Sequence, residues 1–222
     1  MQKPKILAVI PARKNSKGIK NKNILKINKK TTLIEYTFKF VKSLNFITKI
    51  VFTSDSKLMI KLAEKMNIYS IKRKKNLSTS KVSAHSVWRD ALILAEKRYK
   101  KKFDFTIYFE PTSPIRRKKN IIKGIRLITK KKLDMVLSLS KTSINNKDYF
   151  QNGKKIKISK YQEKQTYVRN GIFYICKRDH LLKNNNIFSK SSRAVIIDHE
   201  YSNIDNYLDF LKFKYLIEKN YA

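Results

Sequence analysis

Short apolar runs alternate along the chain with segments whose apolar residues recur at helical spacing. Residues 5–11 (KILAVIP) are a continuous apolar run, the pattern of a strand that is buried on both faces of a sheet. Residues 83–101 have the clearest helical spacing, with Ser83 as the expected N-cap. The same patterns predict strands at 49–53, 68–71, 103–110, 134–140, 171–176 and 194–197, and helices at 32–44, from Ser54 or Ser56 to 66, at 118–130 and at 206–218.

This alternation predicts one α/β domain over residues 1–222, built on a doubly wound and mostly parallel sheet. The sequence has no internal repeat and no stretch that reads as a linker between domains. Residues 141–170 break the pattern, because they are polar and an Asn-Gly turn at 152–153 precedes an alternating stretch at 154–159. We expect this segment to protrude as a small arm.

Lysine dominates a strongly basic composition. The 222 residues include 52 Lys plus Arg against 16 Asp plus Glu, a net charge of +36, and 42 of the 52 are Lys. The lysines occur in doublets and triplets along the whole chain, whereas proteins that read phosphates and bases favour arginine. We interpret most of the charge as solvated surface. A basic nucleic-acid-binding protein is the alternative from a different class.

The remaining composition excludes several classes of protein. Hydrophobic residues make up 41% and aromatic residues 11% of the chain, which suffices for a core and is unlike a disordered polycation. The single cysteine, Cys176, excludes an intramolecular disulfide framework. No run of 18 apolar residues occurs, and the first apolar run is too short for a signal peptide, so we expect a cytoplasmic protein.

The loop after the first predicted strand carries most of the candidate chemistry. Residues 12–24 (ARKNSKGIKNKNI) combine five cations with one glycine, and such a loop at the carboxyl end of a strand can cradle a polyphosphate. The loop has neither the GxxxxGK[ST] nor the GxGxxG pattern. A solvated basic loop is the open alternative.

Four short motifs resemble those of the acylneuraminate cytidylyltransferases. Residues 10–24 (IPARKNSKGIKNKNI) resemble that family's opening motif, IPARxxSKGIPxKNI. Residues 110–116 (EPTSPIR) resemble QPTSPLR, residues 169–175 (RNGIFYI) resemble NGAIYI, and residues 203–206 (NIDN) resemble the DIDT metal motif. The four motifs occur in family order over nearly the whole chain.

The resemblance implies a Rossmann-like nucleotidyltransferase sheet with a small dimerisation arm at 141–170. The implied reaction transfers CMP from CTP to the anomeric hydroxyl of a nonulosonic (sialic-type) acid and releases pyrophosphate. The implied cofactor is Mg²⁺ and the implied assembly is a homodimer, with neither nucleic acid nor a membrane as partner. Two alternatives stay open: a nucleotidyltransferase of the 3-deoxy-manno-octulosonate type, whose loop typically lacks the SKG–KN pattern, and an inactive homologue.

The resemblance also assigns site residues. Its motifs imply catalytic cations at Arg13, Lys17 and Lys22, nucleotide contacts from Ala12, Arg13, Ser16, Asn23, Arg73 and Ser83, sugar contacts from Glu110, Thr112, Ser113, Tyr167 and Arg169, and a metal ligand at Asp205. Lys164 is an alternative to Arg169 as the cation for the sugar carboxylate.

Two positions depart from the family motifs. Glu110 replaces a common Gln and, when ionised, can only accept hydrogen bonds, so legionaminic or pseudaminic acid is as compatible with the motif as sialic acid. Asn203 replaces the first Asp of the metal motif and leaves Asp205 as its one carboxylate, which predicts weaker metal binding. We also expect Asp205 to be able to cap the last helix, with Asp209 exposed or acting as a helix N-terminal charge.

Overall fold

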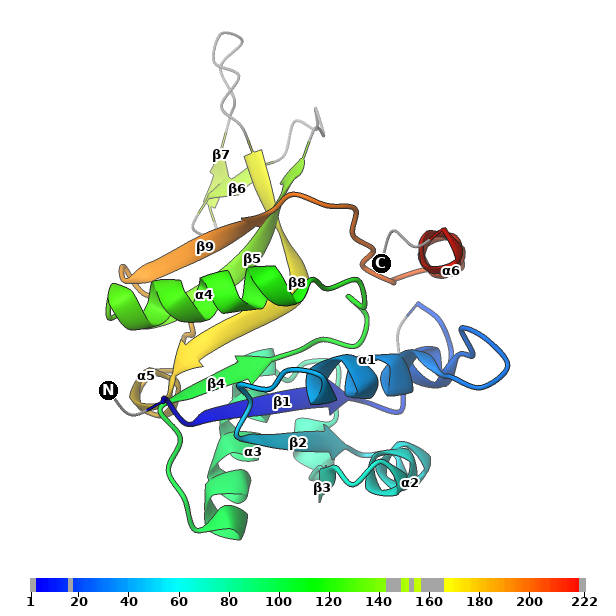
Figure 1. Ribbon diagram of the computed structural model, residues 1–222, viewed down its shortest axis with the longest axis horizontal. Coiled ribbons are helices and arrows are strands. Elements are labelled where there is room, and N and C mark those ends of the chain that lie inside the picture. The colour runs from blue at the N-terminus through cyan, green and yellow to red at the C-terminus, as the bar shows by residue number, and fades with distance from the viewer. Residues whose placement is uncertain (1–2, 16–17, 143–148, 152–153, 157–165, 220–222) are drawn as a thin grey trace, which may run out of the picture.

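A computed structural model describes residues 3–15, 18–142, 149–151, 154–156 and 166–219. Its centre is a seven-stranded sheet in the order β3-β2-β1-β4-β8-β5-β9 (Figure 1). All neighbouring strands pair in parallel except β8, which is antiparallel to both β4 and β5. The predicted α/β class with a mostly parallel sheet is therefore confirmed. The strands are β1 (Ile6–Ala12), β2 (Lys49–Ser54), β3 (Tyr69–Lys72), β4 (Phe105–Tyr108), β5 (Met135–Thr142), β8 (Thr166–Lys177) and β9 (Ser192–Ile197).

The helices match the predicted segments closely, with one exception. Thr32 and Glu35 form a capping box at the start of α1, and Ser56 rather than Ser54 caps α2. The exception is α5, whose six residues are too few to give a helical repeat in the sequence. The helices are α1 (Leu33–Lys42), α2 (Lys57–Lys65), α3 (Ala84–Tyr99), α4 (Lys118–Lys130), α5 (Arg178–Lys183) and α6 (Tyr207–Glu218), with 3-10 turns η1 (Lys22–Ile24) and η2 (Lys75–Leu77).

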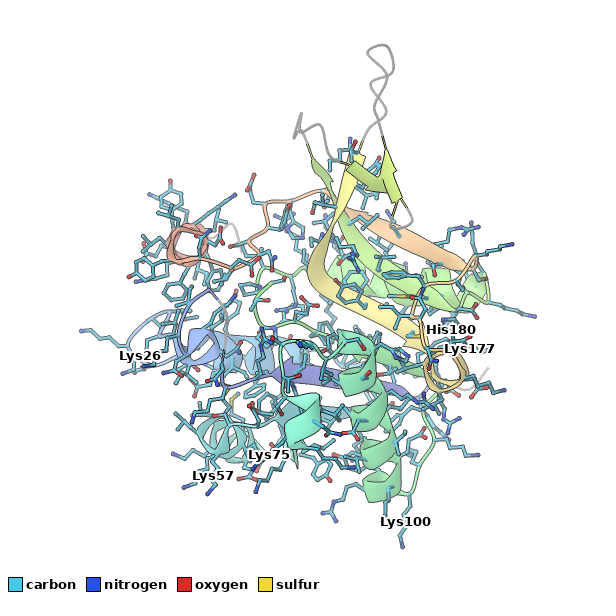
Figure 2. All side chains as sticks on the ribbon, turned by 180° about the vertical axis from the view of Figure 1, so that it is seen from behind. Lys26, Lys57, Lys75, Lys100, Lys177 and His180 are labelled. Carbon is cyan, nitrogen blue, oxygen red and sulfur yellow. The ribbon has the colours of Figure 1, made fainter. Side chains whose placement is uncertain are left out.

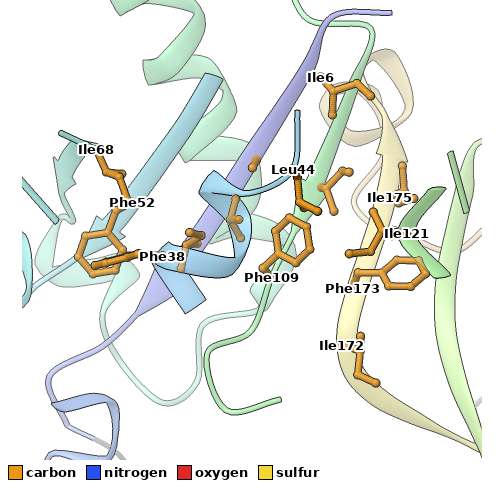
Figure 3. Close-up of a cluster of buried hydrophobic side chains, with 14 of the residues drawn as sticks. Ile6, Phe38, Leu44, Phe52, Ile68, Phe109, Ile121, Ile172, Phe173 and Ile175 are labelled. Carbon is orange, nitrogen blue, oxygen red and sulfur yellow. The ribbon is translucent and has the colours of Figure 1, made fainter. Parts of the chain in front are cut away.

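Both faces of the sheet are covered, which explains why the first strand is continuously apolar. Alternate residues of β1, beginning with Ile6, face a core shared with α1, α2 and α4 (Figure 3). The intervening residues, beginning with Leu7, face a second core that contains Trp88 of α3 and Leu181 of α5. Because side chains alternate along a strand, only an unbroken apolar run can fill both cores.

The last helix, α6, packs at the end of the sheet where β1 terminates (Figure 1). Phe210 and Phe213 of α6 belong to a third apolar cluster, together with Leu33 of α1 and Ile204. This cluster fixes the segment just before α6, residues 203–206, against the loop that follows β1. Two motifs almost 200 residues apart in sequence are thereby brought to the same edge of the sheet.

The segment predicted as an arm contains a second, two-stranded sheet. Strands β6 (Tyr149–Gln151) and β7 (Lys154–Ile156) pair in antiparallel register, as the Asn-Gly turn between them predicts, and project away from the main sheet (Figure 1). The rest of the segment, including Lys164, lies largely outside the described residues.

The lysines are spread over the molecule, as their distribution along the sequence predicts. Lysines project from well-separated parts of the molecule, as Lys26, Lys57, Lys75, Lys100 and Lys177 show in Figure 2. None of the helices in the described ranges is long and apolar enough to cross a membrane. Cys176 is a buried free thiol, and burial raises its pKa to about 12, so it packs as a small apolar residue.

Candidate active site

A pocket of about 590 Å³ opens at the carboxyl edge of β1 and β4. Four connecting segments and the start of α3 line it. The segments are the loop after β1, the segment from β3 to α3, the loop after β4, and the turn before α6. Ligands of doubly wound sheets bind at this edge. The lining includes eight of the predicted site residues: Ala12, Arg13, Lys22, Asn23, Arg73, Glu110, Thr112 and Asp205.

Lys22 is a buried cation at the pocket wall. Its ammonium group donates to the Ile204 carbonyl and lies 3.2 Å from Oδ1 of Asp205, while only 6% of the residue is exposed. Gly18 makes this approach possible, because a Cβ there would lie 1.9 Å from the carbonyl oxygen of Asp205. An ammonium group has three N–H donors, so one remains for a ligand.

Arg13 and Asn23 extend this wall. The Asn23 side-chain amide donates to the Arg13 carbonyl at 3.4 Å, which ties η1 to the end of β1. The Asn23 side-chain oxygen is buried and has no hydrogen-bond partner among the described residues. Since a buried acceptor without a partner is costly, this oxygen is a candidate contact for a ligand donor.

Arg73 lies beneath the pocket and joins two strand ends. Its guanidinium donates to the Thr53 carbonyl at 2.7 Å and to the Ala12 carbonyl at 3.4 Å. Burial lowers the pKa of Arg73, an effect opposed by the nearby Tyr108 and Asp55. These bonds leave the Nη1 atom to contact a ligand, so Arg73 both organises the site and lines it.

Glu110 contributes a carboxyl group to the pocket from the loop after β4. Burial raises its pKa to about 7, although Arg116 and Arg169 pull it down. Gly171 provides the necessary space: its φ is +70°, and a Cβ there would lie 2.7 Å from Oε2 of Glu110. Glu110 can therefore exchange a proton near neutral pH.

Arg116 holds the loop after β4 in place. The guanidinium donates to the Glu110 and Pro114 carbonyls and, at 3.1 Å, to the Ile172 carbonyl. Burial lowers the pKa of Arg116 to about 9, so it remains a cation at neutral pH. Its role is to position the Glu110 backbone rather than to bind a ligand.

Asp205 has both of its carboxylate oxygens engaged by donors. Oδ1 faces Lys22, and Oδ2 accepts from the Asn203 amide at 3.0 Å. The expectation that Asp205 caps the last helix is wrong, because Asn206 is the N-cap of α6. Asp209 completes the capping box by accepting from the Asn206 backbone, as expected for a helix N-terminal charge. No group of three or more His, Cys, Asp or Glu side chains in the described ranges could hold a metal ion.

Several predicted residues do not line the pocket. The Ser83 hydroxyl caps α3 by accepting from the Ser86 backbone, and the buried Ser113 hydroxyl donates to Asn203. Tyr167 is 40% exposed on β8, and Arg169 stacks over Phe188 with 5.5 Å between its Cζ and the ring centroid. Ser16 and Lys17 lie outside the described residues.

The apolar part of the pocket was not predicted. Val82, Ala84, Val87 and Tyr108 line it between the first loop and α3. Tyr108 could have been found, because it lies two residues before Glu110 and alternate residues of a strand share a face. Val87 lies on the apolar side of α3 by its helical spacing, whereas Val82 and Ala84 stand just before and at the start of α3, where the sequence gives no signal for a pocket.

The sheet and the helices on its two faces define a Rossmann-like α/β fold. The chain superposes on the structure of a CMP:2-keto-3-deoxy-manno-octonic acid synthetase complexed with CTP, with a TM-score of 0.72, 13% identity, and coverage of 97% of this chain and 99% of the other. At that identity the likeness shows the fold alone.

Sequence comparison then places the chain in a family. The model of the cytidylyltransferase family matches residues 7–209. The chain belongs to the cytidylyltransferase family, whose members are CTP-dependent nucleotidyltransferases.

Three curated relatives confirm the resemblance seen in the motifs. Post-translational flagellin modification protein B of Campylobacter coli is 34% identical over 97% of this chain and 96% of its own length. CMP-N,N'-diacetyllegionaminic acid synthase of Campylobacter jejuni is 30% identical over 96% and 94%. N-acylneuraminate cytidylyltransferase of Escherichia coli is 31% identical over 93% of this chain, which spans 50% of that relative.

Proposed function

We propose that this protein transfers CMP from CTP to the anomeric hydroxyl of a nonulosonic acid and releases pyrophosphate. The observation that carries the proposal is the pocket at the sheet edge, where Arg13, Lys22, Arg73, Glu110 and Asp205 meet from four separate segments of the chain. The relatives named for N-acylneuraminate and diacetyllegionaminic acid, which match nearly the whole chain, support the sugar class.

The chemistry requires positioning and charge neutralisation more than covalent participation by the protein. The sugar hydroxyl oxygen bonds to the α-phosphorus and its proton passes to solvent, while the bond from that phosphorus to the pyrophosphate breaks and pyrophosphate leaves. In this proposal Arg13, Lys17 and Lys22 neutralise the charge that develops on the phosphates, and Ser16 adds a neutral hydrogen bond to the nucleotide. Asn23 and Arg73 contact the nucleotide, with Ala12 and Ser83 contributing through the adjacent backbone.

The part of the pocket that the loop after β4 lines is the proposed sugar site. Glu110 and Thr112 line it, and Ser113 supports it through Asn203. Arg169 is the proposed partner of the sugar carboxylate, with Tyr167 beside it on the same strand. When Glu110 is ionised it accepts but does not donate, so in that state the sugar presents an O–H or N–H to it, whereas the protonated form can donate to a sugar oxygen.

The remaining assignments are proposals of the same kind. We propose that the enzyme is a cytoplasmic homodimer, that the 141–170 arm contributes to the dimer contact, and that neither nucleic acid nor a membrane is a partner. Mg²⁺ is the proposed cofactor. The donors around Asp205 do not fit a metal held by the protein alone, so no step above depends on one.

Pyrophosphate release tests the proposed function. The purified chain is incubated with each of CTP, UTP, GTP and ATP, with Mg²⁺ and a panel of legionaminic, pseudaminic, sialic and 3-deoxy-manno-octulosonic acids. We expect release only with CTP and only with a nine-carbon acid. Release with the eight-carbon acid alone would support the runner-up enzyme. A protein that binds CTP but releases pyrophosphate with no sugar would refute the enzyme proposal.

A further inference from the structure

The turn before α6 holds a compact cluster of three polar side chains. Oδ1 of Asp205 lies 3.2 Å from the Lys22 ammonium, and Oδ2 accepts from the Asn203 amide at 3.0 Å. The side chain of Asp205 is 71% exposed toward the pocket, whereas that of Lys22 is 8% exposed. One carboxylate, one ammonium and one neutral amide give this cluster no net charge.

Lys22 is fixed in this position by the fold. Its ammonium also donates to the Ile204 carbonyl, and Ile204 is fully buried in the α6 cluster. The Gly18 backbone packs against the carbonyl of Asp205 from the same side. A metal ion that approached Oδ1 of Asp205 would therefore be repelled by the Lys22 ammonium, which the fold holds in place.

Asn203 donates a hydrogen bond to Oδ2, the other carboxylate oxygen of Asp205. The Ser113 hydroxyl donates to Oδ1 of Asn203 at 3.2 Å, which turns the amide nitrogen toward Asp205. Asp209 is committed through Oδ2 to the backbone amides of Asp205 and Asn206. Glu110 lines the same pocket, and the charge of Asp205 helps to raise its pKa, so Glu110 and Asp205 disfavour each other's ionised form. Mg²⁺ sites in proteins use one or two carboxylates with water and phosphate oxygens, and an N–H donor cannot be a ligand.

We propose that the Lys22–Asp205–Asn203 cluster excludes a divalent cation from the CTP-free protein, and that Asn203 is the residue that does so. Mg²⁺ then reaches the pocket only as the complex with the triphosphate, whose oxygens supply the ligands that the protein lacks. This inference rests on the proposed function for the identity of the nucleotide, but its first test needs neither nucleotide nor sugar.

Metal binding without nucleotide is that test. Mn²⁺ serves as the probe, because its free form is measured directly by electron paramagnetic resonance. We expect the wild-type chain to bind no Mn²⁺ at millimolar metal. We expect Asn203→Asp to bind one Mn²⁺ ion per chain, with an affinity at least 10-fold higher than that of the wild-type chain. Asn203→Ala is the matched control, since it removes the amide without adding a carboxylate, and it should bind no metal. Asn203 is exposed, so these changes leave the fold intact.

Two results would overturn the inference: wild-type protein that binds Mn²⁺ as tightly as Asn203→Asp, or an Asn203→Asp variant that gains no affinity. Adding Asp205→Asn to the Asn203→Asp chain should abolish the gained site, and retention of the site would also count against it. The wild-type chain should bind Mn²⁺ once CTP is added. If the protein does not bind CTP, the proposed function is refuted. The Mn²⁺ measurements without nucleotide still decide the inference about Asn203.

Discussion

Replacing Lys22 by alanine is expected to lower kcat/KM for CTP by about 10²–10³-fold, the cost of removing one preorganised donor from a site of charge development. Lys22 is a buried cation whose ammonium is held by the Ile204 carbonyl and Asp205, with one N–H left for a phosphate oxygen. A flexible surface lysine would have to be ordered during the reaction, whereas this one is already in place. Steady-state kinetics with CTP and the best sugar acid measure the effect.

Lys20→Ala is the matched control for Lys22→Ala. Lys20 stands on the same loop and carries the same charge, but it is exposed and does not line the pocket. If the net charge of +36 drew the anionic substrates to the pocket without regard to position, both variants would lose activity alike. An equal and small loss in both would contradict the role given to Lys22. The melting temperature of each variant separates a folding defect from a catalytic one.

Replacing Glu110 by glutamine is expected to stabilise the protein at pH 8.5 by about 2–3 kcal/mol and to change little at pH 4. Burial raises the pKa of Glu110 from 4.5 to about 7. A carboxyl whose pKa is higher in the folded state favours folding below its unfolded pKa, and this contribution is lost as pH rises through about 7. Above that pH the buried carboxylate destabilises the fold, and a neutral glutamine does not.

Urea unfolding at pH 4 and pH 8.5 measures this difference. Glu218→Gln is the control, because Glu218 is an exposed carboxyl near the end of α6. The same stabilisation at both pH values would contradict the raised pKa of Glu110. A loss of sugar affinity in Glu110→Gln, with KM for CTP unchanged, would in addition favour the placement of Glu110 on the sugar side of the pocket.

The sequence predicted most of the helices and strands, because caps and apolar patterns lie within the segments that form them. The capping serine of α3 and the apolar run of β1 contain all the information needed to define their elements. It missed α5, which has only six residues, and it started β8 at residue 171 instead of Thr166. The register shift opposite Ser138, beside the positive φ of Gly171, hides the first half of β8 from pattern reading.

The motifs predicted which loops carry the chemistry but not how side chains pair across them. Lys22 and Asp205 are 183 residues apart, and only packing of α6 against the first loop brings them to 3.2 Å. Without that distance the sequence allowed Asp205 to be read as a free metal ligand and a helix cap. The structure shows that both of its carboxylate oxygens contact donors and that Asn206 is the cap.

The direct test of the central claim is the fate of the anomeric oxygen. A nonulosonic acid labelled with ¹⁸O at the anomeric hydroxyl is converted with CTP, and the product is analysed by ³¹P NMR and mass spectrometry. The account predicts that the label is retained in the bridge between the sugar and the α-phosphorus of CMP, with one unlabelled pyrophosphate released per CMP-sugar. Unlabelled CMP-sugar, or pyrophosphate formed without any sugar product, would contradict it.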